Sequence, residues 1–97
     1  MIIEANGILM GYDLTGKPGG PVITLSHSLA TTREMWWPQL GALEENYQIL
    51  RYDTRGHGET EAPDAPYDIP LLANDVAALL RALEIEQTHF VGLSWAE

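Results

Sequence analysis

The chain of 97 residues contains no cysteine and few basic side chains, with 5 Lys and Arg against 14 Asp and Glu and a net charge of −9. The lack of cysteine excludes disulfide bonds, thiolate catalysis and zinc–sulfur sites. Nucleic acids and anionic membrane surfaces attract clustered Lys and Arg, so neither is expected as a partner. Apolar runs of about 18 residues, which a membrane-spanning helix needs, are missing too. The first residues, Met1-Ile2-Ile3-Glu4, lack the basic and apolar regions of a signal peptide. We therefore expect a cytoplasmic protein.

Short apolar runs recur along the chain instead. They predict strands over Ile2–Ala5, Ile8–Leu14, Val22–Ser26, Gln48–Tyr52 and Thr88–Leu93. Asn6-Gly7 separates the first two runs and is a strong signal for an antiparallel hairpin.

Two helices are expected between the later strands. Thr31-Thr32-Arg33-Glu34 fits a capping box that starts a helical turn, and Pro38 places the firm part of that helix over Pro38–Glu44. Asp68 can cap the second helix, with Pro70 in its first turn. An apolar stripe then follows at helical spacing: Leu72, Val76, Leu79, Leu80 and Leu83. A hairpin followed by strand–helix–strand–helix–strand predicts an α/β fold with a parallel sheet and flanking helices, in one domain over residues 1–97.

The last predicted strand leads directly into Gly92-Leu93-Ser94-Trp95-Ala96, a Gly-x-Ser-x-Ala sequence close to the G-x-S-x-G nucleophile elbow. In such an elbow the serine occupies a tight strand-to-helix turn, and small residues two before and two after it let strand and helix approach. The serine oxygen is then exposed at the carboxyl end of the sheet. The backbone N–H of Trp95 would point at an oxyanion that develops beside it.

With these motifs the chain resembles the N-terminal part of α/β-hydrolase-fold enzymes, most of all the 3-oxoadipate enol-lactonase group and related carboxylic-ester hydrolases. The similarity is carried by the segments Leu25–Thr32 with Met35-Trp36, Arg51–Gly58 and Gly92-Leu93-Ser94. The resemblance implies a sheet order of 1-2-4-3-5 and a small-molecule ester or lactone substrate. It implies Ser94 as nucleophile and the backbone N–H groups of Leu29 and Trp95 as oxyanion hole.

The resemblance also implies that Asp53, Arg55, Gly56 and Gly58 shape the loop after the fourth strand. Ser28 departs from the family, because many relatives have glycine there. Ala96-Glu97 departs from it as well, because family elbows usually continue with two glycines.

The catalytic acid and histidine of such enzymes follow the serine in the chain. Only three residues follow Ser94 here, so we expect weak or no hydrolase activity from the isolated chain. His27 and His57, in loops at the carboxyl end of the sheet, are candidate surrogate bases. Orienting its own loop is the alternative role for His27, and a solvated loop position is the alternative for His57. His89 lies too far down its strand.

A non-catalytic folding or self-assembly module derived from the same scaffold is the alternative function. The apolar strand Thr88–Leu93 would become a sheet edge, and it has no lysine or proline that would disfavour pairing with another chain. We therefore expect homo-oligomers formed through this strand. No cofactor is expected. No metal is expected either, because Asp53, His57, Glu59 and Glu61 lack the spacing of a helix face or of a zinc finger.

Overall fold

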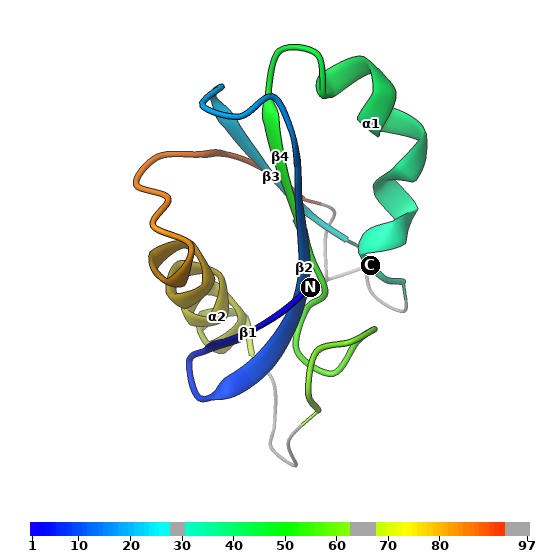
Figure 1. The fold of residues 1–97 in the computed structure, drawn as a ribbon. Coiled ribbons are helices and arrows are strands. Elements are labelled where there is room, and N and C mark those ends of the chain that lie inside the picture. Colours follow the sequence, from blue (N-terminus) through cyan, green and yellow to red (C-terminus); the bar gives the residue numbers. More distant parts are fainter. Residues whose placement is uncertain (28–30, 63–67, 93–97) are drawn as a thin grey trace.

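A computed structural model of the chain describes residues 1–27, 31–62 and 68–92 (Figure 1). The elements, in chain order, are β1 (Ile2–Ala5), β2 (Ile8–Gly16), β3 (Val22–Ser26), the 3₁₀ helix η1 (Arg33–Trp36), α1 (Trp37–Leu43), β4 (Gln48–Tyr52), α2 (Ile69–Ala82) and β5 (His89–Gly92). The strands form one sheet in the order β1-β2-β4-β3-β5. The predicted α/β fold and the predicted strand order are confirmed.

The hairpin of β1 and β2 turns at Asn6 and Gly7, whose φ angles are 52° and 80°. Positive φ at both central residues is the requirement of a type I′ turn, and Asn-Gly meets it without strain. β2 is antiparallel to both β1 and β4, whereas β3 is parallel to β4 and to β5. The sheet is therefore mixed, and its parallel part is formed by the last three strands along the order.

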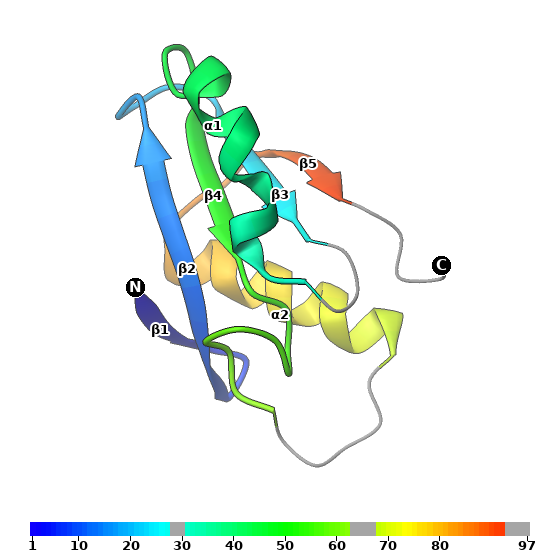
Figure 2. The same cartoon turned by 90° about the vertical axis from the view of Figure 1, so that its right-hand side faces the viewer.

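The two helices cover opposite faces of the sheet (Figures 1 and 2). Alternate side chains of β4 point to opposite faces, so Leu50 joins the core beneath α2 with Leu79, while Ile49 joins the core beneath α1 with Leu40. All four side chains are buried. This two-sided burial explains why Ile49 and Leu50, which are adjacent in β4, are both apolar.

The first helix begins one residue later than the capping box predicts. Thr32, not Thr31, is the N-cap of η1, and its hydroxyl accepts from the N–H of Glu34 at 3.4 Å. The hydroxyl of Thr31 instead lies 3.3 Å from His27 Nδ1, so it contacts a residue at the end of β3 and does not cap the helix. α1 starts at Trp37 with Pro38 in its first turn, one residue before the predicted boundary.

The second helix begins as predicted, with the Asp68 carboxylate accepting from the N–H of Leu71 at 2.9 Å. Val76, Leu79 and Leu80 of the predicted stripe pack into the core beneath α2. Asp75 is buried on the same helix, which the apolar pattern did not predict. None of the described helices has the length and apolar character required to cross a membrane.

Candidate active site

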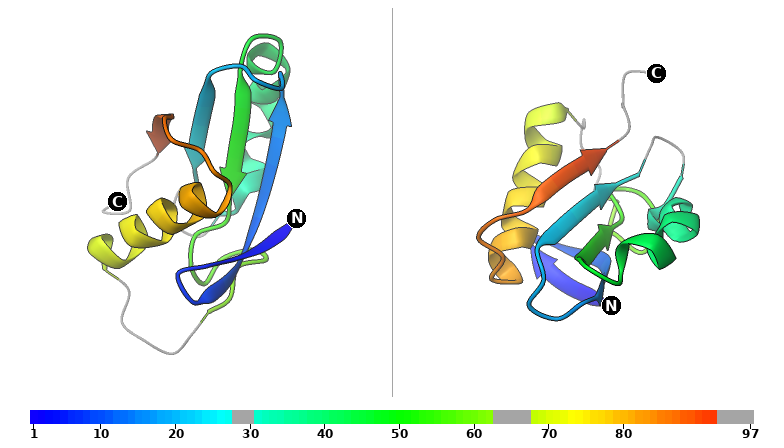
Figure 3. Two further views of the ribbon diagram at one scale, coloured as in Figure 1. Left: turned by 60° about the vertical axis from the view of Figure 1, so that its left-hand side comes forward. Right: turned by 90° about the horizontal axis from the view of Figure 1, so that it is seen from above.

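The candidate site lies where β3, β4 and β5 end. Ser26 is in register with Tyr52 of β4 and with Gly92 of β5, so the three parallel strands finish at the same level. Figure 3 shows β3 and β5 running side by side in one direction. Ligands of open α/β sheets bind at this carboxyl edge. The predicted nucleophile Ser94 and the predicted oxyanion residues Leu29 and Trp95 lie outside the described residues.

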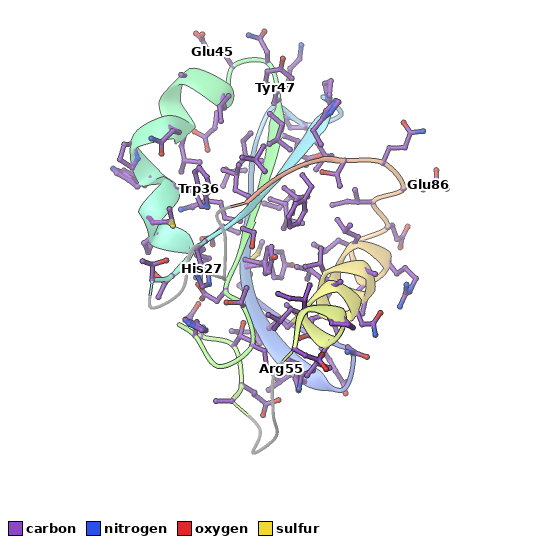
Figure 4. The ribbon with its side chains drawn as sticks, turned by 180° about the vertical axis from the view of Figure 1, so that it is seen from behind. His27, Trp36, Glu45, Tyr47, Arg55 and Glu86 are labelled. Atoms are coloured by element: carbon purple, nitrogen blue, oxygen red, sulfur yellow. The ribbon has the colours of Figure 1, made fainter. Side chains whose placement is uncertain are left out.

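His27 leaves the end of β3 and is fully buried (Figure 4). Its Nε2 accepts a hydrogen bond from the backbone N–H of Thr54 at 2.9 Å, and the Thr54 hydroxyl lies 3.0 Å from the same nitrogen. A nitrogen that accepts from an amide N–H carries no proton, so the neutral ring has its proton on Nδ1. The hydroxyl of Thr31 lies 3.3 Å from that Nδ1.

His57, the second predicted base, is partly buried and lies against His27. The two ring centroids are 5.1 Å apart with an interplanar angle of 53°. His57 Nδ1 lies 3.2 Å from the carbonyl oxygen of Arg55 and 3.3 Å from the Thr54 hydroxyl. The structure thus brings both predicted bases into one polar cluster at the carboxyl edge of the sheet.

The Asp53 carboxylate organises the loop after β4 from within. It is fully buried and accepts from the backbone N–H groups of Arg33 at 2.8 Å and Glu59 at 3.0 Å, and from Arg33 Nη1. Gly58 has a φ of 49°, and a Cβ added there would collide with this carboxylate. Glycine at this position is therefore required both by the backbone conformation and by the close approach of Asp53.

Arg33 joins three carboxylates that are distant in the sequence. Besides Asp53, its guanidinium contacts Asp13 at 2.7 Å and Glu59 at 2.6 Å. Arg51 also reaches Asp13, at 3.2 Å. Burial raises the pKa of Asp13, but the hydrogen bond from Arg33 and the attraction of the nearby cations outweigh it and hold the pKa below its ordinary value. For Arg33, burial lowers the pKa, and the hydrogen bonds to Asp13 and Glu59 raise it overall, so the guanidinium stays charged.

A second ion pair ties the same loop to α2. Arg55 donates to the buried Asp75 carboxylate through Nε at 2.8 Å and through Nη2 at 2.7 Å. Asn6 of the hairpin turn donates to Asp75 as well, at 2.8 Å. These pairs were missed by sequence reasoning, since partners 20 to 69 residues apart leave no local pattern.

Tyr52 is the last residue of β4 and lies beside the end of β3. It is buried, and its hydroxyl donates to Ser26 Oγ at 2.9 Å. Burial raises the pKa of Tyr52 to about 12, helped by the negative charge of Asp75 and opposed by the bond to Ser26. The phenol is therefore neutral and acts as a structural donor at neutral pH.

The acidic residues weighed as metal ligands have other partners. Asp53 and Glu59 bind Arg33, and Glu61 accepts from the backbone N–H of Leu9 at 2.7 Å. Within residues 1–27, 31–62 and 68–92, no group of three or more His, Asp or Glu is arranged to hold a metal ion.

Comparison with known proteins shows which family and which relatives the chain is similar to. The family described as alpha/beta hydrolase fold matches residues 21–96. The chain is 38% identical over 94 residues to 3-oxoadipate enol-lactonase 1 of Acinetobacter baylyi, covering 97% of this chain and 35% of that protein. It is 33% identical over 97 residues to epoxide hydrolase A of Mycobacterium tuberculosis, covering 97% of this chain and 30% of that protein.

Among solved structures, the enol-lactonase from Burkholderia xenovorans superposes with a TM-score of 0.94 at 44% identity, over 97% of this chain and 37% of that one. The chain therefore spans about a third of the length of the relatives it matches.

Proposed function

Because the chain belongs to the family of the alpha/beta hydrolase fold, we propose that it carries the nucleophile side of a hydrolase site for small carboxylic esters or lactones. Ser94 is the proposed nucleophile. The register of Ser26 with Gly92 is the observation that carries the proposal, because the β3 loop and the segment after β5 then leave the sheet from adjacent strand ends.

The proposed reaction is acyl transfer. Ser94 Oγ attacks the carbonyl carbon, its proton passes to a base, and the backbone N–H groups of Leu29 and Trp95 stabilise the negative oxygen of the tetrahedral intermediate. The C–O bond to the leaving alcohol then breaks as that oxygen takes up the proton. Water hydrolyses the resulting acyl-serine by the same steps.

The activity of the isolated chain depends on which group accepts the Ser94 proton. In this family the acid and the histidine follow the serine, and the chain spans about a third of the length of its relatives. Of the two surrogate bases, His27 is the less suited to take up this proton, because its Nε2 lone pair already receives the Thr54 N–H. The ester or lactone preference rests on the enol-lactonase relatives.

The test is hydrolysis of p-nitrophenyl acetate and of a simple γ-lactone by the purified chain beside Ser94→Ala. Thr88→Val is the matched control, because it removes a hydroxyl at the opposite end of β5. Activity that is lost in Ser94→Ala and kept in Thr88→Val supports the proposal. Equal background rates in all three proteins refute Ser94 as an activated nucleophile of this chain.

We also propose that the 97-residue polypeptide self-associates through β5. In the described residues β5 pairs only with β3, and Phe90 and Val91 are 54% and 44% exposed. An unpaired apolar edge of this kind is a template for pairing with a second copy. Light scattering at tens of micromolar tests it: the chain should exceed the monomer mass, and Val91→Lys should restore the monomer. A monomeric wild type contradicts the proposal.

A further inference from the structure

The segment of the proposed oxyanion hole is flanked by two residues that contact the same loop. His27 precedes residues 28–30 and Arg33 follows them closely, and their partners Thr54 and Asp53 are neighbours in the loop after β4. The two flanks are thus attached at adjacent points, although they lie 27 and 20 residues from their partners in the sequence.

On the amino-terminal flank, the attachment fixes the His27 ring. The Thr54 backbone N–H can only donate, so Nε2 must accept, and the proton of the neutral ring is on Nδ1. Placing a proton on Nε2 would break this hydrogen bond and set two donors against each other in a fully buried site. The ring therefore acts as an acceptor that orients the chain where it leaves β3.

On the carboxyl-terminal flank, Arg33 is held through its backbone and its side chain. The backbone N–H and Nη1 both donate to the Asp53 carboxylate, while Nε and Nη2 donate to Asp13 and Glu59. The Arg33 side chain is only 13% exposed. Since Asp53 is itself held by the Glu59 N–H, this flank is fixed in both position and direction.

We infer that the loop after β4 sets the geometry of the oxyanion segment through Thr54 and Asp53, with His27 and Arg33 as positioning residues. This inference rests on the proposed function and assigns His27 no role as a base. An oxyanion hole works only when its N–H groups stand ready where the charge develops. A displacement of about 1 Å can cost on the order of 100-fold in rate, so two attachments to one buried loop serve that need.

The test compares two substitutions of His27 in the full chain. Glutamine can place its Oε1 near the position of Nε2 and accept from the Thr54 N–H, but an amide takes up no proton; leucine does neither. The measured quantity is the rate at which Ser94 is captured by a p-nitrophenyl phosphonate. In this step an Oγ–P bond forms, the P–O bond to nitrophenolate breaks, and the Oγ proton passes to the base or to water. We expect His27→Leu to slow capture about 10- to 100-fold and His27→Gln to restore most of that loss. Equal loss in both variants would mean that the ring acts as a base, and would overturn the inference.

Arg33→Gln tests the other flank against Arg81→Gln, which removes an exposed guanidinium from the last turn of α2. Arg33→Gln should slow capture of Ser94 by a similar factor and speed amide exchange of residues 28–32. Arg81→Gln should change neither. Unchanged capture and exchange in Arg33→Gln would overturn the inference for this flank.

A spectroscopic measurement separates this inference from the proposed function. If Ser94 of the wild type is not captured at all, the proposed function fails for this chain, yet the ¹⁵N resonances of the His27 ring still decide its role. We expect a protonated Nδ1 and an unprotonated Nε2, assigned with His57→Gln to remove the neighbouring ring signals. A protonated Nε2 would overturn the inference whatever Ser94 does.

Discussion

Replacing Asp75 by alanine tests how strongly a buried charge pair holds the loop after β4 to the rest of the fold. The Asp75 side chain is 2% exposed and accepts from Nε and Nη2 of Arg55 and from Nδ2 of Asn6, all within 2.8 Å. The substitution removes the carboxylate and leaves the guanidinium, itself 7% exposed, in a site built to neutralise it. We expect a large loss of stability.

The size of the loss follows from what is left behind. Removing one partner of a buried pair costs about 3–5 kcal/mol, because the remaining charge is not compensated. A domain of this length has a free energy of unfolding of about 5–15 kcal/mol. Asp75→Ala should therefore remove about a fifth or more of the stability. Asn6→Gly deletes one neutral donor and still accepts the positive φ of 52° at this position, so it should cost about 1 kcal/mol.

Urea unfolding, monitored by circular dichroism, measures these differences in the free energy of unfolding. An unchanged slope of that free energy against urea concentration shows that the variants unfold in the same transition as the wild type. Arg81→Ala is the control for an exposed arginine and should stay within about 0.5 kcal/mol of the wild type. The double variant Asp75→Leu with Arg55→Leu should recover much of the loss, because apolar pairs replace buried ion pairs at little cost. A loss below about 1 kcal/mol in Asp75→Ala, or a double variant as unstable as the single one, would refute this reasoning.

Three further predictions concern glycine and ionisation. Gly58→Ala should destabilise the chain by more than about 1 kcal/mol in urea unfolding, because φ is 49° and the Asp53 carboxylate fills the space that the added methyl group needs. Gly41→Ala lies in open space on α1 and should stabilise the chain by about 0.5–1 kcal/mol. Similar effects of the two substitutions would contradict this prediction. The contribution of Tyr52 to the free energy of unfolding should fall as pH rises from 10.0 toward about 12, because the phenol ionises at lower pH in the unfolded chain than in the folded one. Urea unfolding of Tyr52→Phe should lack this loss of stability, and the same alkaline loss in Tyr52→Phe as in the wild type would contradict the prediction. The pKa of Asp13 is lowered in the folded state, so its carboxylate contributes stability above pH 3.8 that is lost as pH falls further. The melting temperature of Asp13→Asn should therefore fall less steeply with decreasing pH than that of the wild type. Melting temperatures that fall equally steeply in the two proteins would exclude the contribution.

The parts of the fold that follow local patterns were predictable from the sequence. Asn6-Gly7 specifies its turn through two positive φ angles, and the strands Val22–Ser26 and Gln48–Tyr52 have the bounds that the sequence predicts. The N-cap of the first helix was predicted one residue early, because Thr31 and Thr32 both offer a hydroxyl and only the tertiary structure engages Thr31 with His27. The elbow at Ser94 stays a prediction.

The residues around the candidate site were predictable in position but not in orientation. Motif spacing placed Asp53 and Arg55 in the loop after β4, at the carboxyl edge of the sheet. What each side chain binds depends on charges brought in by β2, η1 and α2, and a helical pattern that marks α2 as apolar gives no reason to bury Asp75.

Charge pairing also changes how the composition is interpreted. Of the 5 basic residues in the chain, Arg33, Arg51 and Arg55 all bind carboxylates of the folded chain and are at most 13% exposed at their side chains. Most of the positive charge of the chain is therefore placed in ion pairs inside the fold. The same placement explains how a chain of net charge −9 keeps a loop rich in carboxylates together. The arginines neutralise that loop beside the edge of the sheet at which the proposed nucleophile follows β5.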